Sequence, residues 1–317
     1  MKEMENRIRQ MAKDLLAREK VDQVVGFCQG SLAAVTRPFL ARHPEEADQL
    51  VFNCNCRMNL ATFVPDLKGR TGIVAKGCDS RNLVIQMTEN RVKRENLYII
   101  GVPCAGMADK NKLLATAGGR DLIRVIDRGE QIEVETTQGT THTLSRQDLL
   151  QDNCVTCIRH NPVIYDALAG PEVPEPDLQD RFADVAAVQK MDPGEKQAYF
   201  QHLLKDCIRC YACRDACPLC YCPTCFVDES SPQWVGKSLN PVDVTTYHLV
   251  RAFHDAGRCT DCGACEAACP MNIRVRSFTR KTIMDCVNHF GEEAGMNPGQ
   301  RPVLDRFQIN DPNDFFR

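Results

Sequence analysis

Eight cysteines in the second half of the chain repeat one spacing pattern, C-x2-C-x2-C-x3-C-P. The first run consists of Cys207, Cys210, Cys213, Cys217 and Pro218, and the second of Cys259, Cys262, Cys265, Cys269 and Pro270. Such runs are typical of proteins that hold two 4Fe-4S clusters, where the fourth cysteine of each run binds the other cluster. The expected ligands of cluster one are Cys207, Cys210, Cys213 and Cys269, and those of cluster two are Cys259, Cys262, Cys265 and Cys217.

Structural zinc is the alternative for these runs, because CxxC pairs also bind tetrahedral zinc. Zinc needs only two such pairs, so the third CxxC step and the proline after each run would have no purpose. We therefore interpret the runs as ligands of two neighbouring one-electron carriers, and they predict electron transfer. Dehydration chemistry at an open iron site would need a run with a missing cysteine, and both runs are complete.

A third group of cysteines lies in the first half of the chain. Cys56, Cys78 and Cys104 each come just after a predicted strand, and Cys154 and Cys157 form a CxxC pair. Because ligands bind at the carboxyl ends of the strands in an open parallel sheet, these thiols are expected to converge. We predict a third 4Fe-4S cluster. Its expected ligands are Cys56, Cys104, Cys154 and Cys157, with Cys54 and Cys78 as substitutes.

The remaining cysteines divide into a dense loop and isolated positions. Cys220, Cys222 and Cys225 lie within six residues directly after the first run. We predict that they bind a metal or a cluster, either by completing a cluster with Cys154 or Cys157 or by lining the contact between the two halves. Cys28 and Cys286 are expected to be small buried apolar side chains.

The residues that position these cysteines predict two domains of different class. After an N-terminal helix in residues 1–20, residues 21–170 read as an α/β domain with a mostly parallel sheet. Two of the expected strands are nearly continuous apolar runs, as in sheets that are buried on both faces. A helix is expected between them at 80–94, and a small antiparallel hairpin from 122–126 and 131–144. The expected sheet strands are 21–26, 50–53, 71–75 and 96–101.

The second domain is expected to be rich in α-helix and similar to a bacterial dicluster ferredoxin. Proline blocks both helices and strand ladders, and three prolines crowd the start of residues 171–182, which predicts a linker. The ferredoxin-like domain follows at 183–290, with an insertion at 218–258 and a tail at 291–317. Helices are expected at 195–205 and 242–256.

Two groups of basic residues have possible binding roles. Lys76, Ser80 and Arg81 lie where a strand meets a helix, and a helix N-terminus binds anions through its free N–H groups and its dipole. They are therefore expected to bind a phosphate or an acidic cofactor. A basic run after cluster two is expected either to dock an acidic redox partner or to form a solvated face. Its members are Arg274, Arg276, Arg280 and Lys281.

The bulk composition excludes several classes of protein. Nineteen cysteines in a chain of 317 residues with no secretory signal indicate reduced, metal-bound thiols and a cytoplasmic protein. No segment approaches the roughly 20 apolar residues that cross a bilayer. A formal net charge of −3 does not support nucleic-acid binding.

The segment Ile-Ile-Gly-Val-Pro-Cys-Ala-Gly at 99–106 and the pair Cys154 and Cys157, followed by Tyr165, Asp166 and Gly170, resemble a known family. It comprises the beta subunits of coenzyme F420-reducing hydrogenase and formate dehydrogenase, and the similarity extends over about residues 20–280. The resemblance implies a FAD that exchanges a hydride, with clusters that pass single electrons to a catalytic partner. It also implies Cys104, Cys154 and Cys157 as ligands of the core cluster, with Cys56 as the fourth. The FAD would lie near Cys104, with Lys76, Ser80 and Arg81 at its phosphates.

From these observations we expect an electron-transfer iron–sulfur subunit, linked to a flavin, of a cytoplasmic multi-subunit oxidoreductase. The assembly would be of the formate dehydrogenase, hydrogenase or heterodisulfide-reductase type, and the chain would not be catalytic alone. Its partners would be other redox subunits. The alternative is a self-sufficient FAD-dependent oxidoreductase that oxidises reduced coenzyme F420 or NADH and passes the electrons to its own clusters.

Overall fold

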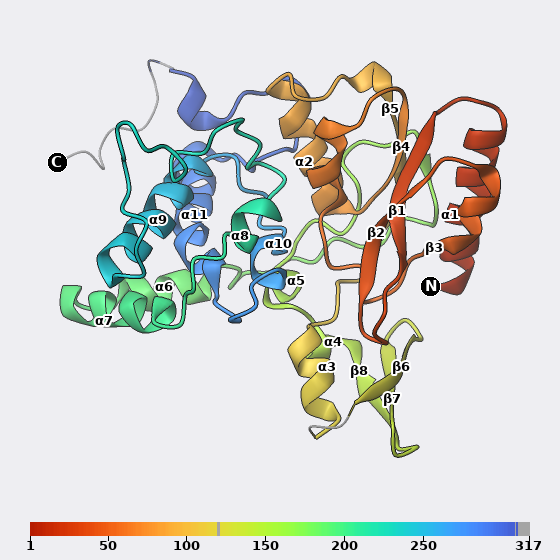
Figure 1. Cartoon of the computed structure of the whole chain (residues 1–317), viewed down its shortest axis with the longest axis horizontal. Helices are drawn as coiled ribbons and strands as arrows, with labels where there is room; N and C mark the ends of the chain where they lie inside the picture. The colour runs from red at the N-terminus through yellow and green to blue at the C-terminus, as the bar shows by residue number, and fades with distance from the viewer. Residues whose placement is uncertain (119–120, 308, 310–317) are drawn as a thin grey trace.

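The computed structural model describes residues 1–118, 121–307 and 309. A sheet-containing half and a helical half lie side by side, with the N-terminal helix on the outer side of the sheet and the long C-terminal helices at the opposite end of the molecule (Figure 1). No helix of the described residues combines the length and the apolar character that a membrane span requires.

The larger sheet is mixed. Its strands are β1 (Gln23–Gln29), β2 (Thr36–Ala41), β3 (Leu50–Val51), β4 (Thr71–Ala75), β5 (Leu97–Gly101) and β9 (Ala167–Leu168). The order is β2-β1-β4-β5-β9, with β3 also paired to β1. The pairs β1·β4, β4·β5 and β5·β9 are parallel, whereas β2 and β3 run antiparallel to β1. The parallel centre agrees with the expectation, but β2 and β9 were not expected.

Helices cover this sheet because its central strands are apolar on both faces. Every residue of β4 is buried, and so are six of the seven residues of β1. Helix α1 (Lys2–Ala17) places Ile8, Ala12 and Leu15 in the core of the sheet domain. Helix α2 (Gly77–Thr88) is the crossover between β4 and β5 and begins three residues before the expected start. The carboxylate of Asp79 caps it by accepting the Lys76 N–H at 2.8 Å.

A second, smaller sheet corrects the expected hairpin. It has three antiparallel strands, β6 (Leu122–Asp127), β7 (Gln131–Thr136) and β8 (Thr141–Ser145), in that order. The run 131–144 is therefore two strands rather than one, because a turn with Gly139 at φ +76° reverses the chain. The short helices beside this sheet are α3 (Lys110–Thr116) and α4 (Arg146–Leu149), and α5 (Asp152–Val155) follows α4 toward α10 (Ala264–Ala267) (Figure 1).

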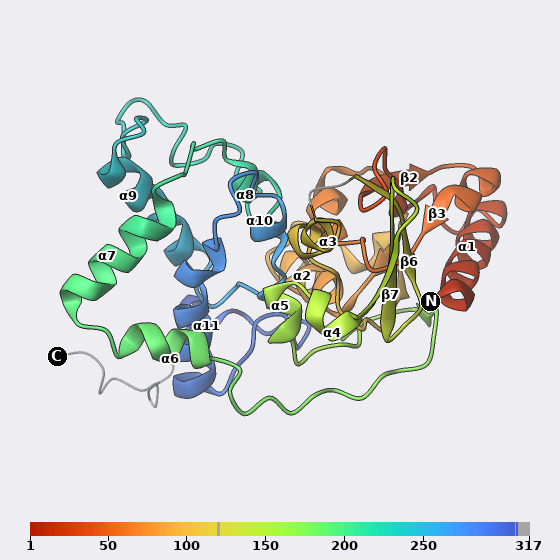
Figure 2. The same ribbon diagram turned by 90° about the horizontal axis from the view of Figure 1, so that it is seen from below.

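A segment without helix or strand connects the halves. Residues 171–182 contain neither element, and Figure 2 shows this stretch running from beside the larger sheet to α6. The helical half then comprises α6 (Ala183–Gln189), α7 (Pro193–Leu204), α8 (Ala212–Asp215), α9 (Pro241–His254), α10 (Ala264–Ala267) and α11 (Arg280–Phe290). Short 3-10 helices are at Pro44–Gln49, Leu60–Asp66, Arg94–Asn96, Val275–Phe278 and Val303–Asp305.

Helix α2 joins the two halves through buried hydrogen bonds. The Arg81 guanidinium donates to the Ala294 carbonyl at 2.8 and 2.9 Å. The Gln86 side chain donates to the Pro218 carbonyl at 2.7 Å, and the Asn82 side chain donates to the Thr260 hydroxyl at 3.0 Å. Buried polar groups of this kind are costly when they lose their partners, so the contact holds the halves in one arrangement.

Candidate metal centres

The structure gathers the cysteines of the two runs into two groups, and the runs exchange their last members. Burial, together with the charges of Cys213, Cys269 and Cys210, raises the pKa of Cys207. Burial and the charge of Cys217 raise the pKa of Cys262 to about 11. Cys269 thus lies with the first run and Cys217 with the second, which is the exchange expected of cross-ligation.

These raised pKa values have a chemical consequence. Thiolates, not thiols, bind metals, and several buried thiolates at one site repel one another. They can all be ionised together only when positive charge lies among them. The iron of a 4Fe-4S cluster supplies that charge, so the grouping fits the cluster that the spacing predicts.

Both runs share one backbone conformation, as a duplicated motif should. Arg209 and Tyr211 in the first run have φ of 49° and 61°, and Asp261 and Gly263 in the second have φ of 59° and 73°. These left-handed positions turn the chain just before the short helices α8 and α10. At Gly263 a Cβ would lie 2.3 Å from the Asn153 side chain, so this close approach requires glycine.

Helix α9, which lies in the insertion between the runs, contacts the cluster-one cysteines. His248 Nε2 lies 3.4 Å from Cys207 Sγ, and the Tyr247 hydroxyl lies 3.6 Å from Cys213 Sγ. Burial, aided by the charges of Arg251 and Arg209, lowers the pKa of His248 to about 4. A neutral imidazole can therefore donate a hydrogen bond to the Cys207 thiolate.

The basic run after cluster two is neither a solvated face nor a docking face. Arg276 and Arg280 are 4% and 2% exposed. Arg276 Nε lies 2.6 Å from Asp261 Oδ1, and Arg280 Nη1 lies 2.6 Å from Asp261 Oδ2. Arg280 also pairs with Asp184 of α6 at 2.6 Å. Because Asp261 lies between two cysteines of the second run, these arginines tie the cluster-two loop to its supporting helices. Only Arg274 and Lys281 keep side chains with 59% and 44% exposure.

A cavity at the carboxyl ends of β4 and β5 collects four more cysteines. Its cysteine lining consists of Cys78, Cys104, Cys154, Cys157 and, from the second run, Cys262. Burial and the charge of Cys154 raise the pKa of Cys104 to about 12. Burial, Asp79 and the thiols of Cys262 and Cys104 raise the pKa of Cys78. This is the convergence expected of residues that follow parallel strands.

Backbone N–H groups already point at three of these sulfurs. The Gly106 N–H donates to Cys104 Sγ at 3.3 Å, and the Met107 N–H donates to Cys154 Sγ at 3.3 Å. The Arg159 N–H donates to Cys157 Sγ at 3.4 Å. Hydrogen bonds to the charged form of a group favour that form, so the loops are shaped to hold thiolates.

The structure does not bring Cys56 to this cavity. Its thiol accepts the Asn53 N–H at 3.5 Å and donates to the Val51 carbonyl at 3.8 Å. It is fully buried in the core of the sheet domain, and Cys54 is fully buried in the core beneath the small sheet. Cys78, which was expected only as a substitute, lines the cavity with Cys104, Cys154 and Cys157, where Cys56 was expected. Cys28 and Cys286 are buried, as expected.

Lys76, Ser80 and Arg81 are committed to partners within the protein. Lys76 Nζ lies 2.8 Å from Asp79 Oδ2 and donates to the Met58 carbonyl at 3.0 Å. The Ser80 hydroxyl donates to the Gly77 carbonyl and accepts the Val163 N–H. Arg81 is 4% exposed and binds the Ala294 carbonyl as described above. The donors expected for an anionic cofactor are therefore occupied.

The cavity adjoins cluster two directly. Thr260, Asp261 and Cys262 of the second run form part of its wall. Asn153, which precedes the cavity residue Cys154 in the sequence, donates from Nδ2 to the Cys262 carbonyl at 3.0 Å. Four cysteines of the sheet domain, Cys78, Cys104, Cys154 and Cys157, thus line one cavity with Cys262 of the second run.

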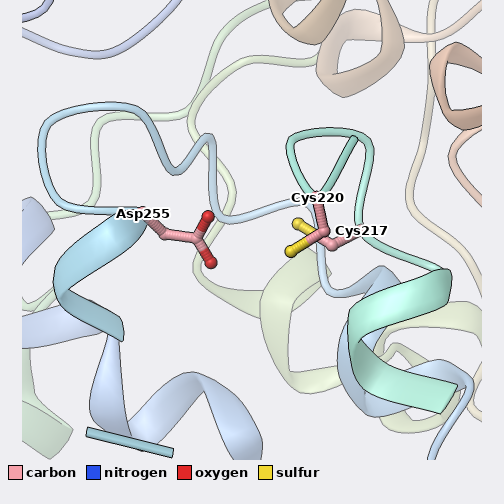
Figure 3. Close-up of side chains that lie close together, drawn as sticks. All are labelled: Cys217, Cys220 and Asp255. Carbon is pink, nitrogen blue, oxygen red and sulfur yellow. The ribbon is translucent and has the colours of Figure 1, made fainter. Parts of the chain in front are cut away.

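The loop cysteines form a separate group. Cys220, Cys222 and Cys225 line a hollow on the other side of the first run together with Asp255 and Arg251, and neither Cys154 nor Cys157 borders it. Figure 3 shows the Cys217 and Cys220 sulfurs on the side of their loop that faces Asp255. The two sulfurs and a carboxylate oxygen of Asp255 lie within 4.8 Å of one another.

Comparisons with known proteins find matches to the cysteine-rich second half and to most of the chain. A family model described as a 4Fe-4S dicluster domain matches residues 206–274. The F420-dependent formate dehydrogenase subunit beta of Methanocaldococcus jannaschii is 23% identical over an alignment of 355 residues, which covers 92% of each chain. The F420-dependent formate dehydrogenase 1 subunit beta of Methanococcus maripaludis is 24% identical over 295 residues, covering 74% of this chain and 75% of the relative.

A solved structure of the F420-reducing nickel-iron hydrogenase complex from Methanosarcina barkeri also matches. Its TM-score is 0.40 at 12% identity, and the match covers 62% of this chain and 83% of that chain. The chain thus carries a 4Fe-4S dicluster domain, and its curated relatives are beta subunits of F420-dependent formate dehydrogenases. The resemblance drawn from the sequence is confirmed.

Two functional contacts were not expected from the sequence. Tyr247 and His248 are neighbours on α9, but nothing in the spacing of the insertion relates them to cysteines that lie 34 and 41 residues earlier. For Cys78 a signal was present, because it follows an apolar strand and opens a helix. Cys56 also follows a strand, and the sequence alone does not distinguish the two.

Proposed function

We propose that the chain is an electron-transfer iron–sulfur subunit of a multi-subunit oxidoreductase of the formate dehydrogenase or hydrogenase type. The observation that supports this most strongly is the continuity of three cysteine groups. The cavity shares Cys262 with the second run, and the two runs exchange Cys217 and Cys269. Clusters in these groups would form one series from the sheet domain through cluster two to cluster one.

For the cavity we propose Cys78, Cys104, Cys154 and Cys157 as the ligands of a 4Fe-4S cluster. All four residues line one cavity, and backbone N–H groups donate hydrogen bonds to three of the sulfurs. When bound, the cluster supplies one-electron chemistry. The chain's own part is to hold the sulfurs, to exclude water, and to adjust the potential through hydrogen bonds and burial.

We propose no flavin step at Lys76, Ser80 and Arg81. Their polar atoms bind Asp79, the Gly77 carbonyl and the Ala294 carbonyl within the protein. A phosphate at this position would have to displace those buried contacts, which are costly to break. The self-sufficient FAD enzyme, which depends on these residues as phosphate ligands, is therefore the weaker alternative.

A partner subunit would approach cluster one, because its ligands lie nearest the surface. Cys210 is exposed, and its neighbour Ile208 is 51% exposed. An apolar groove between α7 and α9 lies close by, lined by Phe200, Val242, Leu249 and Phe278 among others. Phe278 stacks on His248 at 5.6 Å between ring centroids, and His248 contacts Cys207. We propose that the partner redox subunit covers this groove, since exposed apolar patches mark protein interfaces.

The cavity ligands are tested by comparing Cys78→Ser with Cys56→Ser in the full chain, purified without oxygen. Cys78→Ser should lower iron and labile sulfide by about four each, the content of one cubane, and leave the two ferredoxin-type signals in paramagnetic resonance spectra. Cys56→Ser should leave the iron content unchanged. Equal iron content in both variants would refute the cavity cluster, and iron loss confined to Cys56→Ser would move the fourth ligand to Cys56.

A further inference from the structure

Helix α9 carries a buried cation in its last turn. Arg251 is 4% exposed, although its guanidinium is charged at every pH at which the protein is folded. A charged side chain is almost never buried to this extent unless negative groups surround it. The position of Arg251 therefore calls for negative charge nearby.

The chain itself supplies only part of the partners that this cation needs. Arg251 Nη2 donates to the Cys213 carbonyl at 3.2 Å and lies 3.5 Å from Asp255 Oδ2. Its Nε is buried and has no hydrogen-bond partner among the described residues. A buried N–H donor without an acceptor is costly, so this place suits an acceptor that binds beside it.

Arg251 lies against ligands that belong to both ferredoxin-type clusters. It contacts the first group through the Cys213 carbonyl. It reaches the second group through Asp255, because a carboxylate oxygen of Asp255 lies within 4.8 Å of Cys217 Sγ (Figure 3). Burial raises the pKa of Cys213 and of Cys265, and the charge of Arg251 opposes this rise at both thiols. One cation thus acts on sulfurs expected to bind cluster one and on sulfurs expected to bind cluster two.

A positive charge in this position has a definite effect on cluster chemistry. A 4Fe-4S cluster gains one negative charge when it is reduced, and its potential depends on the surrounding charge and on hydrogen bonds to sulfur. The attraction between that charge and a buried guanidinium is only weakly screened. A cation beside both groups would therefore make both clusters easier to reduce.

We propose that Arg251 raises the midpoint potentials of both ferredoxin-type clusters together. The inference rests on the proposed electron-transfer function, because it describes how two members of the cluster series are adjusted. A cation shared by two clusters shifts both potentials in the same direction and so changes the driving force between them little. His248, by contrast, contacts Cys207 of the first group alone among the cluster cysteines whose contacts are described above.

The test compares two variants of the same residue. Arg251→Gln removes the charge and keeps a hydrogen-bond donor, whereas Arg251→Lys keeps the charge. Full-length protein is purified without oxygen, and both clusters are titrated with a reductant and followed by paramagnetic resonance. In Arg251→Gln the equilibrium constant for reduction should fall about tenfold at each cluster, as a neighbouring charge commonly changes an ionisation equilibrium. For a one-electron couple this is a shift of about −59 mV.

The conservative variant and an exposed arginine provide the controls. Arg251→Lys should keep both potentials near the wild-type values. Arg301→Gln is the matched control, because the side chain of Arg301 is 61% exposed and solvent and salt screen its charge. It should leave both potentials unchanged.

Three results would overturn the proposal: unchanged potentials in Arg251→Gln, a shift confined to one cluster, or an equal shift in Arg251→Lys. If Arg251→Gln no longer holds both clusters, full iron content in Arg251→Lys supports a requirement for the charge. Loss of iron in both variants assigns Arg251 to folding alone and overturns the proposal. A wild-type protein without iron refutes the electron-transfer function, whereas loaded clusters that do not respond to Arg251 refute only this inference.

Discussion

His248 Nε2 lies 3.4 Å from Cys207 Sγ, and the imidazole is only 3% exposed. Nδ1 of the same ring has no partner among the described residues, so the tautomer that carries its proton on Nε2 gains the one hydrogen bond available. A donor to a ligand sulfur stabilises the more negative, reduced cluster. Helix α9, an element of the insertion, would therefore adjust the potential of the proposed cluster one.

Removing this donor should lower the midpoint potential of cluster one. In His248→Phe we expect a shift of roughly −40 mV, which corresponds to the loss of about 1 kcal/mol from one hydrogen bond. A redox titration followed by paramagnetic resonance measures it. His202→Phe, on the exposed side of α7, serves as the control and should leave the potential unchanged. Equal potentials in both variants would show that His248 has no electronic role.

Cross-ligation predicts that replacing the last cysteine of one run damages the cluster held mainly by the other run. Cys269→Ser should damage cluster one and spare cluster two, because the charge of Cys269 acts on Cys207 of the first run. Cys217→Ser should do the reverse, since Cys217 lies with Cys262. Spectra of the two variants, recorded under identical reduction, decide the matter. Loss of cluster two alone in Cys269→Ser would contradict the assignment.

Glu293 should contribute to stability in a pH-dependent way. Burial raises the pKa of Glu293, but the charges of Arg81, Arg181 and Arg159 hold this pKa below its usual value. A lowered folded pKa means that the contribution is complete above the unfolded value of about 4.3 and is lost as the pH falls through the lower folded value. Glu293→Gln leaves buried arginines unpaired, so we expect it to lower the free energy of unfolding by about 3 kcal/mol at pH 7.

Thermal unfolding of the wild type and Glu293→Gln at several pH values measures this difference. The gap in Tm should persist from pH 7 to pH 5 and shrink below about pH 4, where the wild-type carboxylate takes up its proton. Glu3→Gln, which breaks an exposed ion pair with Arg7, should change little at any pH. A gap that stays constant into acid would contradict the role of the Glu293 charge.

The sequence was sufficient to predict the features that are encoded by residues close together in the chain. The repeated cysteine runs predicted the 4Fe-4S dicluster domain, because three expected ligands of each cluster are near neighbours in the sequence. The apolar runs of β4 and β5 predicted the parallel centre of the sheet. Strand β2 was missed because Pro38 argues against a strand, yet the strand lies at the end of the sheet order, where proline is tolerated.

Charged residues were misjudged where their partners are distant in the sequence. Arg81 has the composition of an anion site, but its guanidinium donates to the carbonyl of Ala294, 213 residues later. Arg280 was expected at the surface, whereas Asp184, 96 residues earlier, pairs with it in the interior. A charge on its own does not reveal whether folding will bring it a counter-charge, so burial of such residues cannot be derived from spacing.

The most direct test of the electron-transfer role is the content of iron, acid-labile sulfide and zinc per chain in freshly isolated, oxygen-protected protein. We predict a brown protein with at least about twelve iron and twelve sulfide atoms, from two ferredoxin-type cubanes and the cavity cubane, and no stoichiometric zinc. A colourless protein with zinc and without labile sulfide would contradict the relay of clusters on which the proposed function depends.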